Sequence, residues 1–200
     1  MNNLAMSDLV ICGVEELPEH GRRGLTHVVT LIDPDWPEIT AFDTFDAHER
    51  RIFLCHDIID QLPGKTPPSR ELVEDVLGFG KSLTEDLARG EDVRLLIHCH
   101  KGVSRSSAAM LSFLAQVYRD ESPEALFNRL RAIRPQAWPN SVMVGFIDEF
   151  LDYGGALVEG LRVHYGHRLQ AHPRTGEWMA SNGRAREVEM AVMPEVTVSP

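Results

Sequence analysis

The sequence predicts an α/β fold with a central, mostly parallel sheet and helices on both faces. Short apolar runs bounded by turn residues alternate along the chain with longer segments of helical periodicity. The run at residues 93–98 is apolar almost throughout, which is typical of a strand buried on both faces. The 200 residues are 43% hydrophobic and 25% charged, an ordinary composition for one globular domain.

Four strands are expected, and each ends at a turn signal. They are predicted at residues 8–13, 27–32, 51–55 and 93–98. Gly13 ends the first strand and Asp33-Pro34 stops the second. We expect short helical turns and loops between the first three strands, and a loop rich in Pro and Gly after the third.

Capping residues predict where the helices begin. Ser69 precedes a helical segment that runs to about residue 88 and is followed by Gly90. A second helix is expected from Ser104 or Arg105 to about residue 119. A third follows Ser122 to residue 133, with proline at its first position, and a last helix runs from Asn140 to about residue 157.

The composition changes after residue 160. Residues 161–200 contain several glycines and prolines and show no sustained periodicity. We therefore divide the chain into one domain over residues 1–160 and a C-terminal extension over 161–200, expected to be loosely packed or partly disordered.

The charge balance limits the partners of this protein. The formal net charge of −10 disfavours binding to nucleic acid and stable association with an anionic membrane. Three scattered cysteines fit the reducing cytoplasm, and no histidine has metal-ligand spacing, so we expect neither a metal nor a cofactor. No feature of the sequence indicates an oligomeric state.

The stretch from residue 98 to 106 carries the chemistry. It lies between a predicted strand and a predicted helix, where successive backbone N–H groups can curl around an anion. Gly102 permits a backbone conformation that a Cβ would resist, and the planar fork of Arg105 can hold two oxygens of an oxyanion. The predicted binding loop consists of His100, Lys101, Gly102, Val103, Ser104 and Arg105.

Cys99 stands at the start of this loop. A thiol near a helix N-terminus and an arginine loses its proton more easily, and the thiolate can attack phosphorus. Ser106 can donate a hydrogen bond to the sulfur and help it leave in a second step.

The pattern His98-Cys99-x-x-Gly102-x-x-Arg105-Ser106 resembles the signature of the cysteine-dependent protein tyrosine phosphatases, in the compact dual-specificity-like branch of bacterial type. Residues 24–31, 66–76 and 134–140 resemble further segments of that group, so the resemblance covers roughly residues 8–158. It implies a phosphatase fold and hydrolysis of phosphoproteins through a phosphocysteine, without cofactor. Phosphotyrosine is the expected substrate, and phosphoserine and phosphothreonine stay open.

The resemblance also implies an acid on the loop after the third strand. Asp57 matches the offset, and Asp60 is the alternative. Trp36-Pro37-Glu38 lies one strand too early, and we interpret it as a turn with a core tryptophan. His98 is expected to support the loop from behind, and Asn140 to orient loops near the pocket or to cap its helix.

Other functions remain open at this stage. One is a phosphatase for phosphoinositides or small molecules, and another is a catalytically inactive module that binds phosphorylated ligands. The spacing Cys99-x5-Arg105 also occurs in proteins that resemble rhodaneses and arsenate reductases, so sulfur transfer and arsenate reduction are weaker alternatives.

Overall fold

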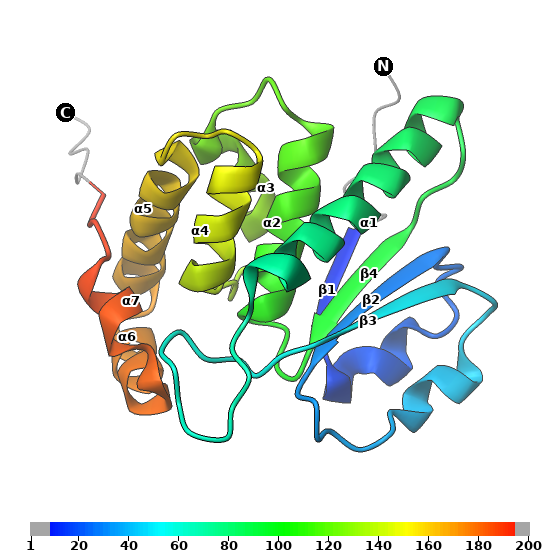
Figure 1. Ribbon diagram of the computed structural model, residues 1–200, viewed down its shortest axis with the longest axis horizontal. Coiled ribbons are helices and arrows are strands. Elements are labelled where there is room, and N and C mark those ends of the chain that lie inside the picture. Colours follow the sequence, from blue (N-terminus) through cyan, green and yellow to red (C-terminus); the bar gives the residue numbers. More distant parts are fainter. Residues whose placement is uncertain (1–8, 195–200) are drawn as a thin grey trace.

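A four-stranded parallel sheet forms the centre of the computed structural model, which describes residues 9–194 (Figure 1). The strands are β1 (Leu9–Gly13), β2 (His27–Ile32), β3 (Glu49–Leu54) and β4 (Leu95–Cys99), in the order β1-β4-β2-β3. All three pairings are parallel. The four predicted strands are therefore confirmed, with small differences at their ends.

The position of β4 between β1 and β2 decides where the loop after Cys99 lies. Gly13 of β1 pairs with Cys99, and Thr30 of β2 pairs with His98. Parallel strands end at the same edge of a sheet, so the loops after β1, β2, β3 and β4 meet there.

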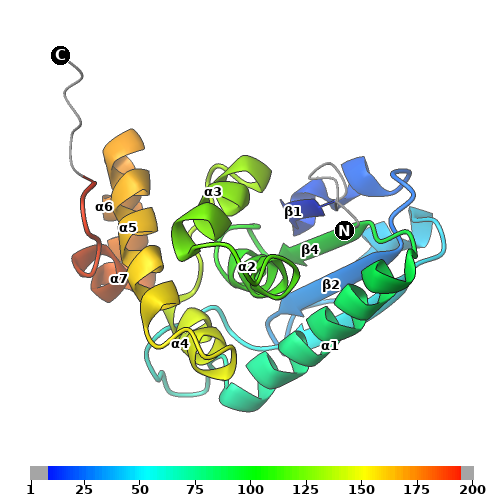
Figure 2. The ribbon, with the colours of Figure 1, turned by 90° about the horizontal axis from the view of Figure 1, so that it is seen from above.

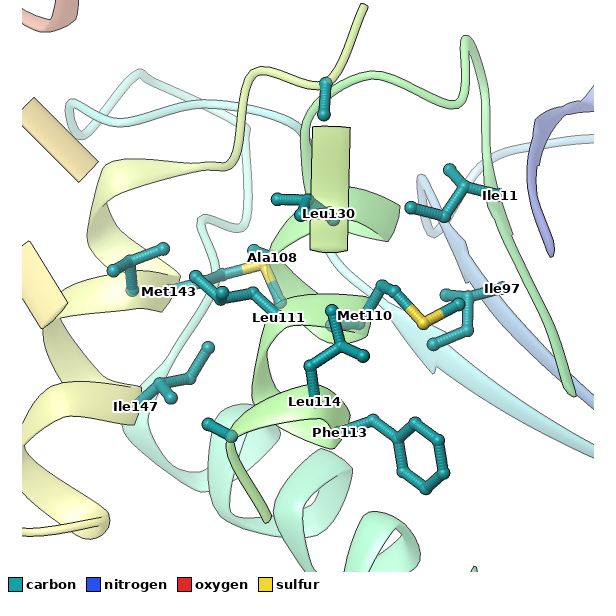
Figure 3. Packing of buried hydrophobic residues seen from close by; sticks show 14 of the residues in the cluster. Ile11, Ile97, Ala108, Met110, Leu111, Phe113, Leu114, Leu130, Met143 and Ile147 are labelled. Atoms are coloured by element: carbon teal, nitrogen blue, oxygen red, sulfur yellow. The ribbon is translucent and has the colours of Figure 1, made fainter. Parts of the chain in front are cut away.

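One face of the sheet is covered by α-helices. Figure 2 shows α1 (Arg70–Arg89) and α2 (Arg105–Val117) along this side of the strands. Beyond them lie α3 (Pro123–Ile133), α4 (Ser141–Phe150) and α5 (Ala156–Ala171). In Figure 3, Met110 of α2 lies next to Ile97 of β4, while Leu111 points toward Met143 of α4. The buried α2 thus packs against the sheet on one side and against α4 on the other.

Two short 3₁₀ helices cover the opposite face. They are η2 (Val14–His20) and η3 (Thr40–Thr44). Leu17 of η2 packs on Val28 and Leu96 of the sheet, with Phe42 of η3 at the edge of this cluster. Helices therefore lie on both faces, as predicted, but the layers are of unequal depth.

The predicted caps are present. The side chain of Ser69 accepts a hydrogen bond from the Leu72 N–H at 3.2 Å, and Gly90 ends α1 in the left-handed conformation. Ser122 accepts from the Ala125 N–H at the start of α3. Asn140 accepts from the N–H groups of the first turn of α4. Each of these side chains satisfies a helix donor that has no partner within its own helix.

The predicted last helix from residue 140 to 157 is wrong, because two helices occupy this segment. Helix α4 ends at Phe150, and a turn with Gly154 and Gly155 at positive φ precedes α5. The carboxylate of Asp148 accepts from the Gly155 N–H at 2.6 Å and from the Leu157 N–H at 2.8 Å. A cap for α5 thus lies inside α4, where no local pattern indicates it.

The C-terminal segment differs from the expected loose extension. Helix α5 crosses residue 160, and α6 (Arg174–Met179), the π-helical turn η4 (Ala180–Arg184) and α7 (Ala185–Glu189) fold back beside it. Leu161 and Tyr165 are fully buried, and the Tyr165 ring stacks on Trp138 at 4.2 Å. Polar residues such as His164 are also buried in α5, so the sequence shows no apolar stripe. The rest of the predicted extension, 195–200, lies outside the described residues.

Candidate active site

The loop between β4 and α2 is pressed against the end of β1. Gly102 has φ 65°, and a Cβ there would lie 2.7 Å from the nitrogen of Gly13. The His100 carbonyl accepts from the Val14 N–H at 3.1 Å. The guanidinium of Arg134 donates to the carbonyls of Gly102 at 3.0 Å and Lys101 at 3.2 Å. Three carbonyls are thus bound from outside the loop, which favours N–H groups directed inward.

Sequence reasoning missed Arg134, which does more than end a helix. Its guanidinium also pairs with Glu16 of η2 at 2.7 Å, and its side chain is only 12% exposed. Because Glu16 compensates the charge, Arg134 can stay buried while it holds the loop.

Cys99 differs from the other two cysteines in its surroundings. Its Sγ lies 3.2 Å from the hydroxyl oxygen of Ser106, in the first turn of α2. Burial raises the pKa of Cys12 to about 12 and that of Cys55 to about 11. Cys12 and Cys55 are therefore protonated core residues, and Cys99 is the cysteine that faces a helix N-terminus.

Arg105 is buried, and not all of its N–H donors are used within the described residues. One of its terminal nitrogens donates to the carboxylate of Asp33 at 2.6 Å and to the carbonyl of Cys55. Its Nε is buried and has no hydrogen-bond partner within the described part of the chain. A buried donor without a partner is costly, which makes this nitrogen a contact point for an anion.

Asp57 lies just beyond the end of β3, with three donors on one carboxylate oxygen. They are the Ser104 hydroxyl at 2.7 Å, the Asn140 amide at 3.3 Å and the guanidinium of Arg184. Burial alone would raise the pKa of Asp57, but Arg184, Arg105 and these hydrogen bonds outweigh it and lower the pKa. The side chain is still 31% exposed, so the carboxylate can be reached from solvent.

Asp60 lies elsewhere on the same loop. It is 59% exposed and pairs with the exposed Arg186 at 3.1 Å. It is absent from the lining of the cavity that Asp57 faces.

The two residues predicted to support the site are His98 and Asn140. Nε2 of the buried His98 is 2.7 Å from the Thr30 hydroxyl, which also accepts from Arg50 at 3.0 Å. Burial, with Arg50 and Arg105 nearby, lowers the pKa of His98 to about 3, so the imidazole is neutral. Asn140 caps α4 with its side-chain oxygen, and its side-chain amide nitrogen donates to the carboxylate of Asp57 at 3.3 Å.

A cavity of about 330 Å³ lies over this loop. Its walls come from the loop, the segments after β2 and β3, and the C-terminal segment. The lining residues are Asp33, His56, Asp57, Ile58, Leu62, Lys65, His100, Lys101, Val103, Ser104, Arg105, Trp178, Met179, Asn182 and Arg184. Most predicted loop residues are therefore brought together here, whereas Gly102 packs against β1 and Cys99 and Ser106 are buried beside the lining residues.

Two of the groups of lining residues that sequence reasoning missed differ in the signal that they carry. Asp33 directly follows β2, so its place at the shared edge of the parallel strands was a usable signal. Trp178, Met179, Asn182 and Arg184 carried no such signal, because they reach the cavity through the packing of α5 to α7. The expectation that Trp36 is a core residue is wrong, because its side chain is only partly buried and packs on the His100 ring at 4.3 Å.

One cluster near the cavity has metal-ligand chemistry. Asp33, Asp35 and His56 place one ligand atom each within 4.8 Å of one another. Arg105 already neutralises Asp33 and Asp35 is exposed, so we assign this cluster to ion pairing. Among the described residues, no helix has the length and apolar character to cross a membrane.

Protein phosphatases are among the known proteins that this chain resembles. No protein-family model matches the chain. The Slingshot homolog 3 protein phosphatase of Mus musculus is 34% identical over 77 residues, and that of Homo sapiens is 33% identical over 79. These matches cover 38% and 40% of this chain but only 11% of each relative, so the chain spans about a tenth of their length.

Solved structures extend the likeness to most of the chain. Human DUSP28 superposes with a TM-score of 0.54 and 17% identity, over 75% of this chain and 95% of that one. The Yvh1 phosphatase domain of Chaetomium thermophilum gives 0.51 and 22% identity, over 76% and 94%. Human tyrosine phosphatase-like serine/threonine/tyrosine-interacting protein gives 0.50 and 15%, over 74% and 93%. The chain thus has the fold of the dual-specificity and tyrosine phosphatases, and resembles their cysteine-dependent superfamily in its loop from His98 to Ser106.

Proposed function

We propose that this protein is a cysteine-dependent phosphatase that hydrolyses phosphomonoesters on proteins through a phosphocysteine intermediate. The observation that carries the proposal is the buried Nε of Arg105, which has no hydrogen-bond partner among residues 9–194 and lies at the start of the helix that Cys99 faces. A nucleophile and an anion-binding donor at one helix N-terminus suit attack on a phosphate ester.

In the first step the Cys99 thiolate attacks phosphorus, forming the S–P bond as the P–O bond to the substrate breaks. The leaving oxygen takes a proton from Asp57, which becomes a carboxylate. Arg105 and the backbone N–H groups of the loop bind the charge on the other phosphoryl oxygens.

In the second step water attacks phosphorus and gives its proton to the Asp57 carboxylate. The S–P bond breaks and the electron pair returns to Cys99, whose sulfur accepts a hydrogen bond from Ser106 at 3.2 Å. Inorganic phosphate leaves, and the enzyme returns to its starting protonation. Because the pKa of Asp57 is lowered, the protonated form needed in the first step is most abundant at acidic pH.

The walls of the cavity support a choice among the possible substrates. Leu62 and Trp178 are exposed apolar side chains that line the cavity together with Met179. They favour an aryl phosphate, and hence phosphotyrosine, over a small polar alcohol. The names of the relatives, which are protein phosphatases, support a phosphoprotein substrate. We place the protein in the cytoplasm without a nucleic-acid or membrane partner, because of its net charge of −10 and three free cysteines.

The test is hydrolysis of p-nitrophenyl phosphate as a function of pH, in chelator and reductant. Cys99→Ser should lower kcat by on the order of 10⁴-fold, because the nucleophile is lost. Asp57→Asn should lower it by roughly 10²-fold and flatten the basic limb of the profile, because no acid protonates the leaving group.

Asp60→Asn is the matched control and should behave like the wild type. A normal basic limb in Asp57→Asn would move the acid role away from Asp57. Phosphopeptides containing phosphotyrosine or phosphoserine, compared with phosphoinositides, then identify the substrate class.

A second function is favoured by the state of Asp57. The ion pair with Arg184 holds it as a carboxylate, which suits a module that binds phosphorylated ligands without turnover. Tungstate binding with no hydrolysis dependent on Cys99 would support this binding module and exclude the enzyme.

A further inference from the structure

Arg184 connects two loops of the candidate site although it belongs to the C-terminal segment. Its guanidinium donates to the Asp57 carbonyl at 3.0 Å, to the Asp57 carboxylate and to the Ser104 hydroxyl at 3.0 Å. Asp57 lies on the loop after β3, and Ser104 lies in the loop before α2. Figure 1 shows α6 and α7 beside the loop that follows β3. One side chain thus joins the loop of the proposed acid to the predicted anion-binding loop.

Arg184 is held in this position from behind. Its other terminal nitrogen lies 3.1 Å from the carboxylate of Glu187, which is fully buried. Glu187 also accepts from the Trp138 indole at 2.8 Å and from the Ser141 N–H at 2.8 Å. The Trp138 N–H in turn donates to the carbonyl of Val103 at 2.8 Å. The network therefore returns to the anion-binding loop and leaves Arg184 little freedom to turn away.

The charges around Asp57 come from several elements. Arg105 from α2 and Arg184 from η4 are cations, and Ser104 and Asn140 are neutral donors. Glu187 lies behind Arg184 and balances part of its charge. The arrangement supplies donors and positive charge to an ionised Asp57, which is the form that exists after this residue has given up its proton.

We propose that Arg184 is a positioning residue of the phosphatase reaction, which fixes the loop of Asp57 on the anion-binding loop and stabilises Asp57 as a carboxylate between the two steps. This inference rests on the proposed function. If Arg184 has this role, the C-terminal segment contributes to the reaction, because Arg184 influences the pH range in which Asp57 can donate and accept a proton.

The experiment measures kcat/KM for p-nitrophenyl phosphate against pH in Arg184→Gln, with Arg186→Gln as the matched control. Arg186 lies two residues away, is 58% exposed and contacts Asp60 and the Ile59 carbonyl of the same loop. Removing the Arg184 charge should move the basic limb up by about one pH unit, because a half-buried carboxyl without its cation holds its proton longer. The acidic plateau should fall about tenfold, because the loop is less well positioned.

The two remaining variants give specific outcomes. Arg184→Lys keeps the charge and should return the basic limb to the wild-type position, and Arg186→Gln should match the wild type throughout. An unchanged basic limb in Arg184→Gln would overturn the inference and leave Arg184 a purely structural residue. A higher rate at every pH would also overturn it, because Arg184 would then restrain the acid.

A measurement without substrate separates this inference from the proposed function. The ¹³C titration of the Asp57 side chain, assigned by its loss in Asp57→Asn, reports the carboxyl directly. We expect its midpoint to rise in Arg184→Gln and to stay in place in Arg186→Gln, with the fold checked by thermal unfolding. A wild type without turnover would overturn the proposed function, whereas an unmoved midpoint in an active enzyme would overturn the role of Arg184 alone.

Discussion

Two segments line the same cavity and reach it in different ways. Residues 98–106 form one strand end, one loop and one helix start, so their relative positions follow from adjacency along the chain. Arg184 reaches Asp57 across 127 residues of sequence, through helices packed on α4 and the loop before it. The first segment can be recognised from spacing, and the second only from tertiary packing.

The difference shows which charged residues of a site are placed by local geometry and which are placed by distant packing partners. In the loop, the placement of Cys99 and Arg105 depends on a short local geometry that Gly102 permits. In the C-terminal segment, the placement of Arg184 depends on a buried partner, Glu187, whose own partner is Trp138 of another segment. Substitutions in the two segments should therefore affect activity and stability in different ways.

The largest expected effect separates the two arginines. Arg105→Lys should lower kcat/KM by about 10²–10³-fold, because an ammonium cannot reproduce the planar fork that binds two phosphoryl oxygens. Arg184→Lys should stay within about threefold, because an ammonium keeps the charge beside Asp57 and loses only part of the contacts that position the two loops. Steady-state kinetics of both variants at the pH optimum checks this, and equal losses would erase the contrast between the segments.

A smaller effect compares two glycines with positive φ. Gly102→Ala should destabilise the fold by about 3 kcal/mol, because the methyl group would collide with the backbone of β1 in addition to the left-handed strain. In Gly183→Ala of η4 no atom of the described part of the chain lies within 4 Å of the new Cβ, so the change should cost only about 1 kcal/mol.

Urea unfolding of both glycine variants gives the comparison. Equal losses of stability would mean that the loop can move away from β1, and that close packing does not constrain it. Activity should fall in Gly102→Ala well before the fold is lost, because the loop carries Cys99 and Arg105.

A third effect is a pH dependence of stability shared by both segments. Burial lowers the pKa of His98 and of His164 to about 3, against 6.5 in the unfolded chain. Below pH 6.5 these histidines bind protons in the unfolded state but not in the folded state. The free energy of unfolding therefore falls as the pH decreases from 6.5 toward 3. Each histidine should cost about 2 kcal/mol at pH 5.

Chemical unfolding at pH 7 and pH 5 measures this loss. His164→Gln keeps a polar group for the Ala137 carbonyl, which His164 contacts at 3.0 Å, and should reduce the slope by about half of the joint effect. His98→Gln tests the same for the loop. A stability that does not change between the two pH values would show that water reaches both rings.

Much of the fold could be predicted from the sequence because its signals are local. Ser69 and Gly90 delimit α1, and apolar runs mark all four strands. The end of α4 could not be predicted, because Asp148 caps the following helix from a position inside its own helix. The role of Arg184 could not be predicted for the same reason. One arginine among glycines and prolines becomes informative only when the structure places Asp57 beside it. The roles of Cys99, Arg105 and Asp57 stay predictions until the kinetics are done.

The contact between Asp57 and Arg184 also has a consequence for synthesis of the chain. A growing chain contains the proposed acid, nucleophile and anion-binding arginine once Arg105 has been added, but Arg184 follows 79 residues later. The proposed acid loop would therefore be secured only after α5 to α7 have docked. In that case a chain made only as far as α2 would display its loop without processing ligands efficiently, and full activity would require that α5 to α7 have been made and docked.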